Sequence, residues 1–279
     1  MIKVIKEGLF STIQDTGRFG FKNIGVPVSG AMDQSSAKLA NLLLGNDESS
    51  AVLEMTLVGP TLEFMNDTYI SITGADMNPS LNKKKVLLNK QLFVNKGDIL
   101  YLSHSSNGMR TYLGIKGGFN SEKKLGSKSF YKGITKSEKL IKNDKIKFDQ
   151  TINSSMKTNK NINDFKINRK SKINVFKGPE FDSLDSNSRD LIFKTHFTIG
   201  VNNRMGYNLV EAIDNKIPSI ISSPVMPGTV QLTPSGKLII LCRDCQTTGG
   251  YPRILQLDKN SINRLSQKTI GEIINFKLV

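Results

Sequence analysis

The densest concentration of groups that could bind or transform a small molecule lies between Arg243 and Pro252. The segment reads Arg-Asp-Cys-Gln-Thr-Thr-Gly-Gly-Tyr-Pro and follows an apolar stretch, Leu238–Leu241, typical of a buried strand. Because glycine lets the backbone approach closely, such a loop can hold a carboxylate, a phosphate or an amide. A polar hairpin turn is the alternative explanation. The residues that we expect to bind substrate or an anion here are Gln246, Thr247, Thr248, Gly249, Gly250 and Tyr251.

Two arginines stand in further polar and glycine-containing clusters. Arg204 lies in an Asn-Asn-Arg-Met-Gly-Tyr sequence, and Arg18 follows Gln-Asp-Thr-Gly. The planar guanidinium suits a carboxylate or phosphate, whereas a lone arginine is by default a salt-bridge partner. Asp244 and Asp15 are candidates for accepting a proton or orienting an N–H group. We therefore expect Asp244, Asp15 and Arg204 to be catalytic and Arg18 to bind an anion.

Several familiar chemistries are absent from the sequence. His104 and His196 have no metal-ligand spacing, and Cys242 and Cys245 form a single C-x-x-C without a second pair. There is no Walker A loop, no dinucleotide fingerprint and no G-x-S-x-G elbow. We expect no metal site, and we interpret Cys242 as a core residue and Cys245 as incidental.

The elements that must position these loops are mainly strands. Short β-branched or aliphatic runs are bounded by Gly, Pro, Asn and Asp, and they include 61–64, 69–73, 111–115 and 237–241. One helix is predicted over 33–44, with Asp33 as N-cap and Gly45 just beyond its end. A weaker helix is predicted from near Asp185 toward Phe193. The predicted fold class is mainly β with a few helices.

An internal echo suggests two related halves. Arg18-Phe19-Gly20-Phe21 is matched by Arg204-Met205-Gly206-Tyr207, each reading Arg–apolar–Gly–aromatic. Downstream, Thr61–Phe64 is matched by Thr229–Leu232. Short matches of this kind also arise by chance. If the pseudo-repeat is real, it predicts two similar units built like β-barrels.

The division between the halves is expected where the composition changes. Between residues 151 and 172, Asn, Lys, Ser and Thr dominate and apolar residues become sparse. We interpret this segment as a linker or a surface excursion, with a decorated loop inside one domain as the alternative. The expected domains are residues 1–150 and residues 173–279, the second of which carries the Gln246–Tyr251 loop.

The bulk composition excludes several classes of protein. The net charge of +15 raises the possibility of a nucleic-acid partner, but the lysines are scattered among Asn, Ile and Ser, aromatic residues make up 7%, and tryptophan is absent. No apolar run approaches the ~18 residues of a membrane helix, and the start of the sequence has no signal-peptide core. Two cysteines cannot build a disulfide framework. We expect a cytoplasmic protein without nucleic-acid or membrane partners.

Taken in order along the chain, these clusters resemble the biotin-dependent carboxyltransferase (allophanate hydrolase subunit 2-like) family. In the first half the resemblance is carried by Ser11–Arg18, Gly25–Asp33, Ala40–Asn46, Leu53-Glu54, Gly74–Asp76, Gly108–Arg110 and Gly117-Gly118. In the second half it is carried by Gly178–Glu180, Asn203–Tyr207 and Gln246–Pro252. The last of these motifs is the most specific.

The resemblance implies cyclophilin-like β-barrels and an enzyme that works as a complex. The family includes the C subunit of the prokaryotic 5-oxoprolinase. That enzyme also needs a kinase-inhibitor-like B subunit, together with an A subunit, to open the 5-oxoproline lactam to glutamate at the expense of ATP, with Mg. The family further includes part of urea carboxylase, which moves carboxyl from carboxybiotin to urea.

One of these members is favoured over the others. A chain without a biotin carboxylase or carrier domain is more similar to the oxoprolinase component. The alternatives are a biotin-dependent carboxyltransferase and a regulatory antagonist of a histidine-kinase inhibitor.

The sequence departs from the family pattern at two places in its first half. Lys132–Glu138 stands where the family usually has a glycine-rich stretch, and Lys116 replaces a usually small residue before Gly117-Gly118. These departures put in doubt what the first half contributes to a substrate pocket more than what the second half contributes.

Overall fold

The fold is that of a computed structural model, which describes residues 1–149 and 172–279. Among these residues the chain divides into two compact units. Unit 1 comprises residues 1–18 and 29–149, and unit 2 comprises residues 19–28 and 172–279. The expected linker, 151–172, lies outside the described residues except for Lys172, so the domain boundary stays a prediction.

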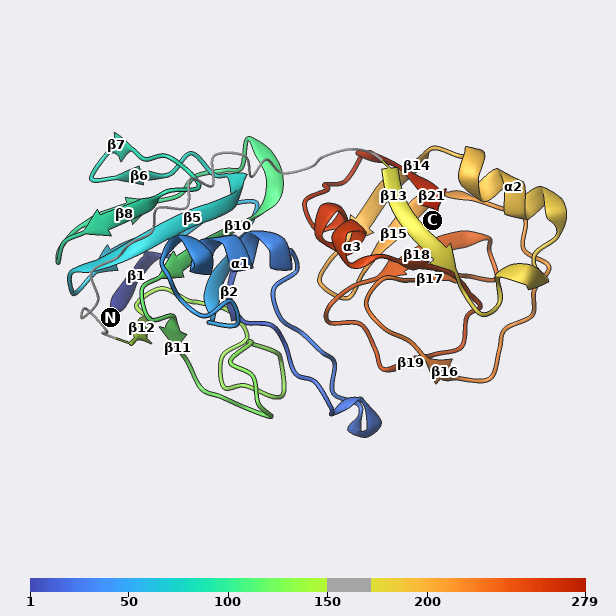
Figure 1. Ribbon diagram of the computed structural model, residues 1–279, viewed down its shortest axis with the longest axis horizontal. Coiled ribbons are helices and arrows are strands. Elements are labelled where there is room, and N and C mark those ends of the chain that lie inside the picture. Colours follow the sequence, from blue (N-terminus) through green and yellow to red (C-terminus); the bar gives the residue numbers. More distant parts are fainter. Residues whose placement is uncertain (150–171) are drawn as a thin grey trace. The chain divides into compact units, whose positions relative to one another are not determined.

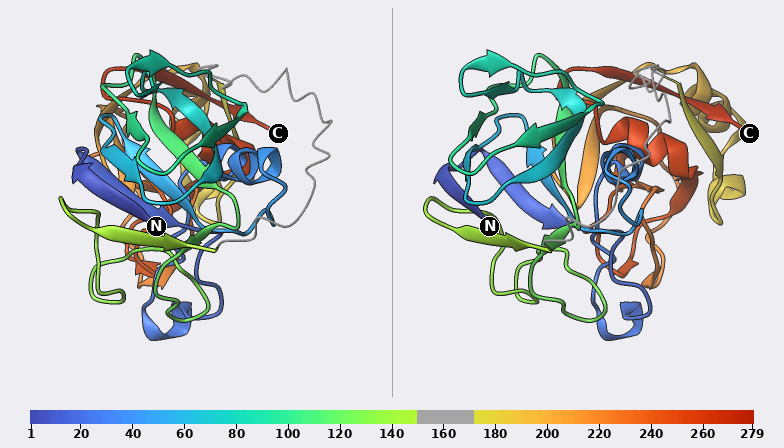
Figure 2. Two further views of the ribbon diagram at one scale, coloured as in Figure 1. Left: turned by 90° about the vertical axis from the view of Figure 1, so that its left-hand side faces the viewer. Right: turned by 60° about the vertical axis from the view of Figure 1, so that its left-hand side comes forward.

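Unit 1 is built from two sheets, one of seven strands and one of five (Figure 1). The seven-stranded sheet has the order β11 (Phe119–Asn120), β12 (Lys145–Phe148), β1 (Ile2–Lys6), β4 (Thr61–Phe64), β9 (Ile99–Tyr101), β6 (Ser80–Leu81) and β7 (Lys84–Lys85). The five-stranded sheet has the order β2 (Phe10–Gln14), β3 (Val52–Thr56), β10 (Asn107–Ile115), β5 (Thr68–Asp76) and β8 (Gln91–Val94). Strands β1 and β12, dark blue and yellow-green in Figure 2, pair side by side although they come from opposite ends of the unit.

Alternation along the strands of unit 1 creates its core. In β1, Ile2 and Val4 are fully buried while the intervening Lys3 is not, as expected for a strand with one apolar face. Strand β5 is more completely buried, because helix α1 (Gln34–Leu43) packs against it as well. The hydroxyls of Ser71 and Thr73 donate to backbone carbonyls of this helix. These bonds give each buried hydroxyl group a hydrogen-bond partner.

The two predicted helices are confirmed. Helix α1 begins after Asp33, whose carboxylate accepts from the backbone N–H of Ser36 and from its hydroxyl. Helix α2 (Ser186–Lys194) begins after Asp185, which caps Ser188 in the same way. Each aspartate satisfies N–H groups that the first helical turn leaves without partners.

Helix α3 (Lys259–Leu265) was not predicted from the sequence. It begins after Asp258, and the Asp258 carboxylate accepts from the backbone N–H of Ser261. The Asp-x-x-Ser spacing is therefore common to α1, α2 and α3. That spacing was the available signal, and the shortness of the helix concealed it.

Unit 2 contains a closed barrel of seven strands. Its order is β13 (Lys172–Lys177), β20 (Arg253–Leu257), β17 (Thr229–Leu232), β18 (Lys237–Leu241), β15 (Gly206–Ala212), β14 (Phe197–Asn202) and β21 (Ile273–Leu278). Parallel pairing of β13 with β21 closes the ring. The unit also contains a small two-stranded sheet of β16 (Ser223–Pro224) and β19 (Thr248–Gly249), and the 3-10 turns η1 (Lys22–Ile24) and η2 (Phe181–Ser183). The predicted mainly-β class is confirmed; barrel closure is found in unit 2, whereas unit 1 distributes its strands over two sheets.

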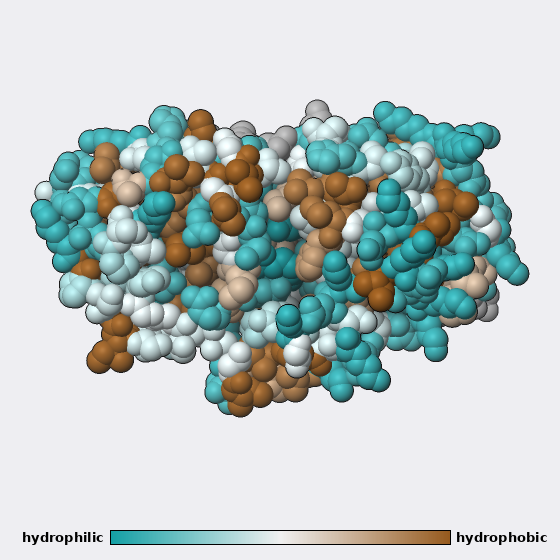
Figure 3. All heavy atoms as spheres, turned by 180° about the vertical axis from the view of Figure 1, so that it is seen from behind, coloured by the Kyte–Doolittle hydropathy of each residue, from teal (hydrophilic) through white to brown (hydrophobic). Residues whose placement is uncertain are grey.

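The segment around η1 exposes apolar side chains. Phe19 and Ile24 are 66% and 64% exposed, and Figure 3 shows hydrophobic residues gathered at the lower edge over this projecting turn. Exposed apolar patches of this kind are typical of contact surfaces. Among residues 1–149 and 172–279, no helix has the length and apolar character that crossing a membrane requires.

Candidate functional site

A pocket of about 220 Å³ opens in unit 2 beside the loop that the sequence singled out. Five of its lining side chains are amides: Asn202, Asn203, Asn208, Gln231 and Gln246. Its apolar wall comes from Val201, Met205, Ile239 and Leu241, with Tyr251 at the edge. No charged side chain is among the described residues that line it. The pocket therefore offers neutral hydrogen-bonding groups beside an apolar surface.

One side of the pocket is the turn between β14 and β15. The Asn203 side-chain oxygen accepts from the backbone N–H groups of Met205 and Gly206, at 2.7 and 3.2 Å. The Asn203 backbone N–H in turn donates to the Gly206 carbonyl at 3.0 Å. This is the local backbone bonding by which asparagine favours turns over strands. The turn fixes where the preceding residue, Asn202, lies.

Asn202 combines a place in the pocket lining with a buried side-chain oxygen that has no hydrogen-bond partner among the described residues. Its amide nitrogen donates to the Gly200 carbonyl at 3.3 Å, but its side-chain oxygen is buried and accepts no hydrogen bond from any described residue. A buried polar atom without a partner costs about 1–3 kcal/mol, so such atoms are uncommon and call for an explanation. That oxygen has almost no exposed surface, so a bound N–H donor would reach it only after the Asn202 side chain turns toward the pocket.

Gln231 organises the opposite side of the pocket. It lies on β17 and is 1% exposed. Its amide nitrogen donates to the Tyr251 carbonyl at 3.2 Å, and its amide oxygen accepts from the Gln246 amide at 3.4 Å. One buried side chain thus holds both ends of the 246–251 loop. Sequence reasoning noted Gln231 only as part of the internal echo and assigned it no role.

Gly249 is required by this arrangement. A Cβ atom at this position would lie 2.5 Å from the Gln231 amide nitrogen, so Gly249→Ala should push the Gln231 side chain aside and break its bond to Tyr251. We expect the free energy of unfolding to fall by about 0.5–1.5 kcal/mol, the usual value of one hydrogen bond. Chemical denaturation measures this change. Gly250→Ala is the matched control, because the nearest atom to its Cβ is the Ile220 carbonyl oxygen at an ordinary 3.5 Å; equal effects of the two substitutions would contradict the role given to Gln231.

Arg204 and Asp244 are brought together, but neither is among the residues that line the pocket. The Arg204 Nε donates to one Asp244 oxygen at 2.7 Å, and an Arg204 terminal nitrogen donates to the other at 3.1 Å. The two side chains are only 8% and 10% exposed. A bidentate pair of this kind fixes geometry on both sides. The pair fastens the β14–β15 turn to the segment after β18, with the Asp244 N–H donating to the Arg204 carbonyl as well. The geometry favours positioning, and the catalytic roles expected of both residues stay predictions.

The rest of the expected binding loop divides between pocket and scaffold. Gln246 and Tyr251 line the pocket. Thr248 and Gly249 form β19 and pair with β16, while the Thr247 and Gly250 carbonyls accept from Val225 and Ile220. The middle of the loop is therefore anchored to residues 220–225, and the expected binding roles of Thr247, Thr248, Gly249 and Gly250 stay predictions.

Asp15 and Arg18 lie in unit 1, where both tie the start of the chain to residues 124–129. The Asp15 carboxylate accepts from the hydroxyls of Ser127 and Ser129 at 2.6 and 2.7 Å, and from two backbone N–H groups. Arg18 is 1% exposed and donates to the carbonyls of Lys124 and Ser129. These contacts give both residues a structural task, and their expected roles in catalysis and anion binding stay predictions.

The two cysteines are free thiols, and both are buried. Cys242 and Cys245 are 1% and 3% exposed, and burial raises the pKa of the Cys245 thiol to about 11. At pH 8 about 0.1% of such a thiol is ionised, against about a quarter at an ordinary pKa near 8.5. We expect Ellman's reagent to react at pH 8 only after denaturation in guanidinium. Rapid reaction of the native protein would show that the thiols are accessible. The described residues hold no group of three potential metal ligands from His, Cys, Asp and Glu.

Comparison with known proteins identifies the fold and its family. The model of the family described as "Carboxyltransferase domain, subdomain A and B" matches residues 24–278. The chain belongs to this carboxyltransferase-domain family. The resemblance seen in the sequence motifs is thereby confirmed.

Individual carboxyltransferase-domain relatives extend over the whole chain. It is 34% identical to the 5-oxoprolinase C subunit of Escherichia coli, over 99% of this chain and 90% of that protein. It is 32% identical to the 5-oxoprolinase C subunit of Haemophilus influenzae, over 100% of this chain and 91% of that protein. The crystal structure of the urea amidolyase of K. lactis matches 99% of this chain with a TM-score of 0.87 and 26% identity, but the chain spans only 18% of that protein.

Proposed function

We propose that this chain is the C subunit of a prokaryotic, ATP-dependent 5-oxoprolinase, which hydrolyses 5-oxoproline to glutamate together with its A and B subunits. The carrying observation is an uncharged pocket lined by five amide side chains, in a chain similar over nearly its full length to two proteins named as 5-oxoprolinase C subunits. The pocket chemistry suits a small amide, since an amide needs one acceptor for its N–H and one donor for its oxygen.

A lactam matches the groups on both sides of the pocket. Once the Asn202 side chain turns toward the pocket, the N–H of the ring would donate to its oxygen, which accepts from no described residue. The ring oxygen would accept from an amide such as that of Gln246, and the ring methylenes would contact Ile239 and Leu241. Polar groups that fix orientation within an apolar wall are the usual design of a small-molecule site.

The same pocket supports only part of the reaction. The carboxylate of 5-oxoproline finds no cation among the described lining residues, so we assign its recognition to other parts of the complex. Mg-ATP does not fit the pocket either, because a triphosphate needs cationic side chains and the ion needs carboxylates. We therefore assign ATP to one of the partner proteins and the whole complex to the cytoplasm.

A carboxyltransferase acting with biotin is the second candidate. The ureido ring of biotin is a neutral cyclic urea, so it presents the same N–H and carbonyl groups as a lactam. The uncharged amide lining suits both rings, and the family description names carboxyl transfer.

Reconstitution distinguishes the candidates. Mixed with its neighbouring-gene partners, the chain should form a complex that releases glutamate from 5-oxoproline only when ATP is present. The isolated chain should be inactive, because we expect the site to be divided among the proteins of the complex. Turnover that depends on biotin would support carboxyl transfer instead. A stable complex with neither activity would favour a regulatory role.

A further inference from the structure

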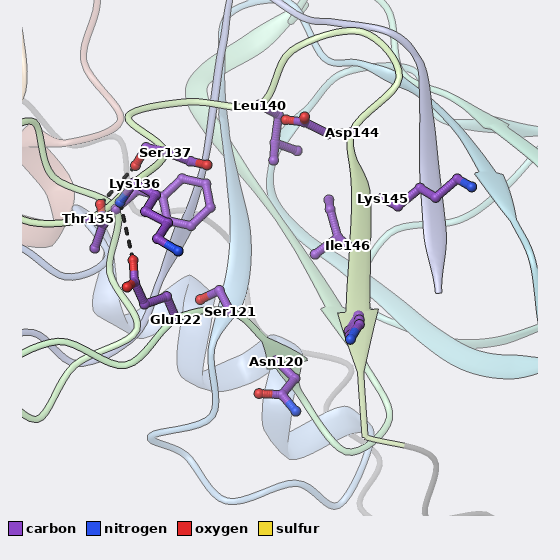
Figure 4. Close-up of a pocket in the computed structure, with 12 residues that line it drawn as sticks. Asn120, Ser121, Glu122, Thr135, Lys136, Ser137, Leu140, Asp144, Lys145 and Ile146 are labelled. Carbon is purple, nitrogen blue, oxygen red and sulfur yellow. Dashed lines mark hydrogen bonds between the residues drawn. The ribbon is translucent and has the colours of Figure 1, made fainter.

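A second and larger pocket, of about 290 Å³, lies entirely in unit 1. It is bounded by the end of β11, the long segment that follows it and the start of β12 (Figure 4). The segment includes Lys132–Glu138, where the sequence departs from the expected family pattern. This pocket shares no lining residue with the pocket of unit 2. The function proposed above makes no use of it.

The pocket combines an apolar floor with a polar rim. Phe130, Leu140 and Ile146 line it, and all three belong to the core of unit 1 or pack against that core. Because the core fixes these side chains, the floor is preformed. The hydroxyl of Ser137 lies on the rim, and Figure 4 shows it directed toward the enclosed space. The volume is near the lower end of the range of about 300–1,000 Å³ typical of ligand sites, which suits a small molecule.

The charge around this pocket is strongly positive. Residues 120–147 contain nine lysines against three acidic residues, a net charge of +6 within a protein whose total is +15. Lys136 lines the pocket, and its side chain extends from the loop toward the space between the labelled residues, whereas Lys145 points away from them (Figure 4). A wall of one sign raises the local concentration of the opposite charge.

The acidic residues of the rim are already engaged. Glu122 accepts from the Lys136 backbone N–H at 3.2 Å and pairs with Lys124 at 3.2 Å. Asp144 accepts from the Ile141 backbone N–H at 2.9 Å. Both carboxylates keep their negative charge, so the lining carries a net charge of +1 from three lysines, Lys136, Lys145 and Lys147, and two acidic residues. Of the lysines labelled in Figure 4, Lys136 is the one that extends toward the interior.

We propose that this pocket binds a small organic anion with an apolar body. The anionic group lies against the Lys136 ammonium and the Ser137 hydroxyl, and the apolar body covers Phe130, Leu140 and Ile146. The inference rests on the geometry of unit 1 alone, so it does not depend on the proposed 5-oxoprolinase function.

Fluorine NMR on the full chain tests the proposal with 4-fluorobenzoate as the anionic probe. We expect saturable binding at millimolar or lower concentration, weakened by 0.5 M KCl because exposed charges are screened. Lys136→Gln, which keeps the length of the side chain without its charge, should weaken binding about tenfold. Ser137→Phe, which fills the pocket, should abolish it, and an unchanged melting temperature would show that each variant is folded.

Two controls separate this site from general attraction to a basic surface. Lys139→Gln removes an exposed lysine of the same segment that does not line the pocket, and it should change the affinity less than twofold. The neutral probe 4-fluorobenzyl alcohol should bind at least tenfold more weakly than the anion. No saturable binding up to about 10 mM, equal losses in Lys136→Gln and Lys139→Gln, or equal affinities of the two probes would each overturn the proposal.

Discussion

Arg204→Ala should lower the free energy of unfolding by about 3–5 kcal/mol. The substitution leaves the Asp244 carboxylate, only 10% exposed, without the guanidinium that accompanies it into the interior. Removing one partner of a buried ion pair costs more than the pair itself contributes, because the remaining charge has lost its solvation. An anion-binding role alone would leave stability almost unchanged, so denaturant unfolding distinguishes the positioning role from the catalytic one.

Two comparisons make this result interpretable. Lys177→Ala breaks an exposed ion pair of the same unit, with Asp182, and should cost less than about 0.5 kcal/mol. The double variant Arg204→Met/Asp244→Leu removes both charges together, and we expect it to recover much of the lost stability. If Arg204→Ala is as stable as the parent but inactive in the reconstituted complex, Arg204 acts on the substrate and our structural interpretation is wrong.

Asn202→Leu should reduce kcat/KM of the reconstituted complex about ten- to a hundredfold. The leucine removes the buried oxygen that we assign to the N–H of the substrate amide, and a binding site that lacks one designed partner loses about 1.5–3 kcal/mol of transition-state stabilisation. Stability should not fall by that amount, because the oxygen accepts no hydrogen bond from the described part of the protein. Relief of this buried polar atom should even offset part of the cost of the substitution.

The matched control is the same change at another asparagine of the pocket. Asn208 is exposed, and its amide donates to the Val201 carbonyl. We expect Asn208→Leu to change kcat/KM less than threefold. Asn202→Asp should retain more activity than Asn202→Leu, because it keeps an acceptor oxygen in the same place. Equal losses in Asn202→Leu and Asn208→Leu would remove the support for a specific contact at Asn202.

Local sequence was sufficient for much of the fold. Alternating apolar residues predicted the strands around Thr61–Phe64 and Lys237–Leu241, and Asp33 and Asp185 marked the starts of the two helices that were expected. These signals are local, because strand alternation and N-capping act between residues a few positions apart. Helix α3 was not predicted, because its seven residues are too few to show a helical periodicity in the sequence.

The sequence predicted only part of the candidate site. Polar and glycine-rich composition led to the 246–251 loop, and Gln246 and Tyr251 do line a pocket. Composition could not show that Gln231, fifteen residues upstream of Gln246, holds that loop from strand β17. Nor could it show that Arg204 is matched by Asp244, forty residues downstream, in a bidentate pair.

The sequence by itself determined which residue types were available, where strands and most helices begin, and the family to which the chain belongs. Only the tertiary structure decided which polar groups are already satisfied. A hydrogen bond depends on atoms within about 3.5 Å, and barrel closure brings together residues that lie far apart in the chain. That is why Arg204, the more conspicuous residue in the sequence, belongs to the scaffold by its contacts, while the nearby Asn202 has a buried oxygen without a hydrogen-bond partner among the described residues.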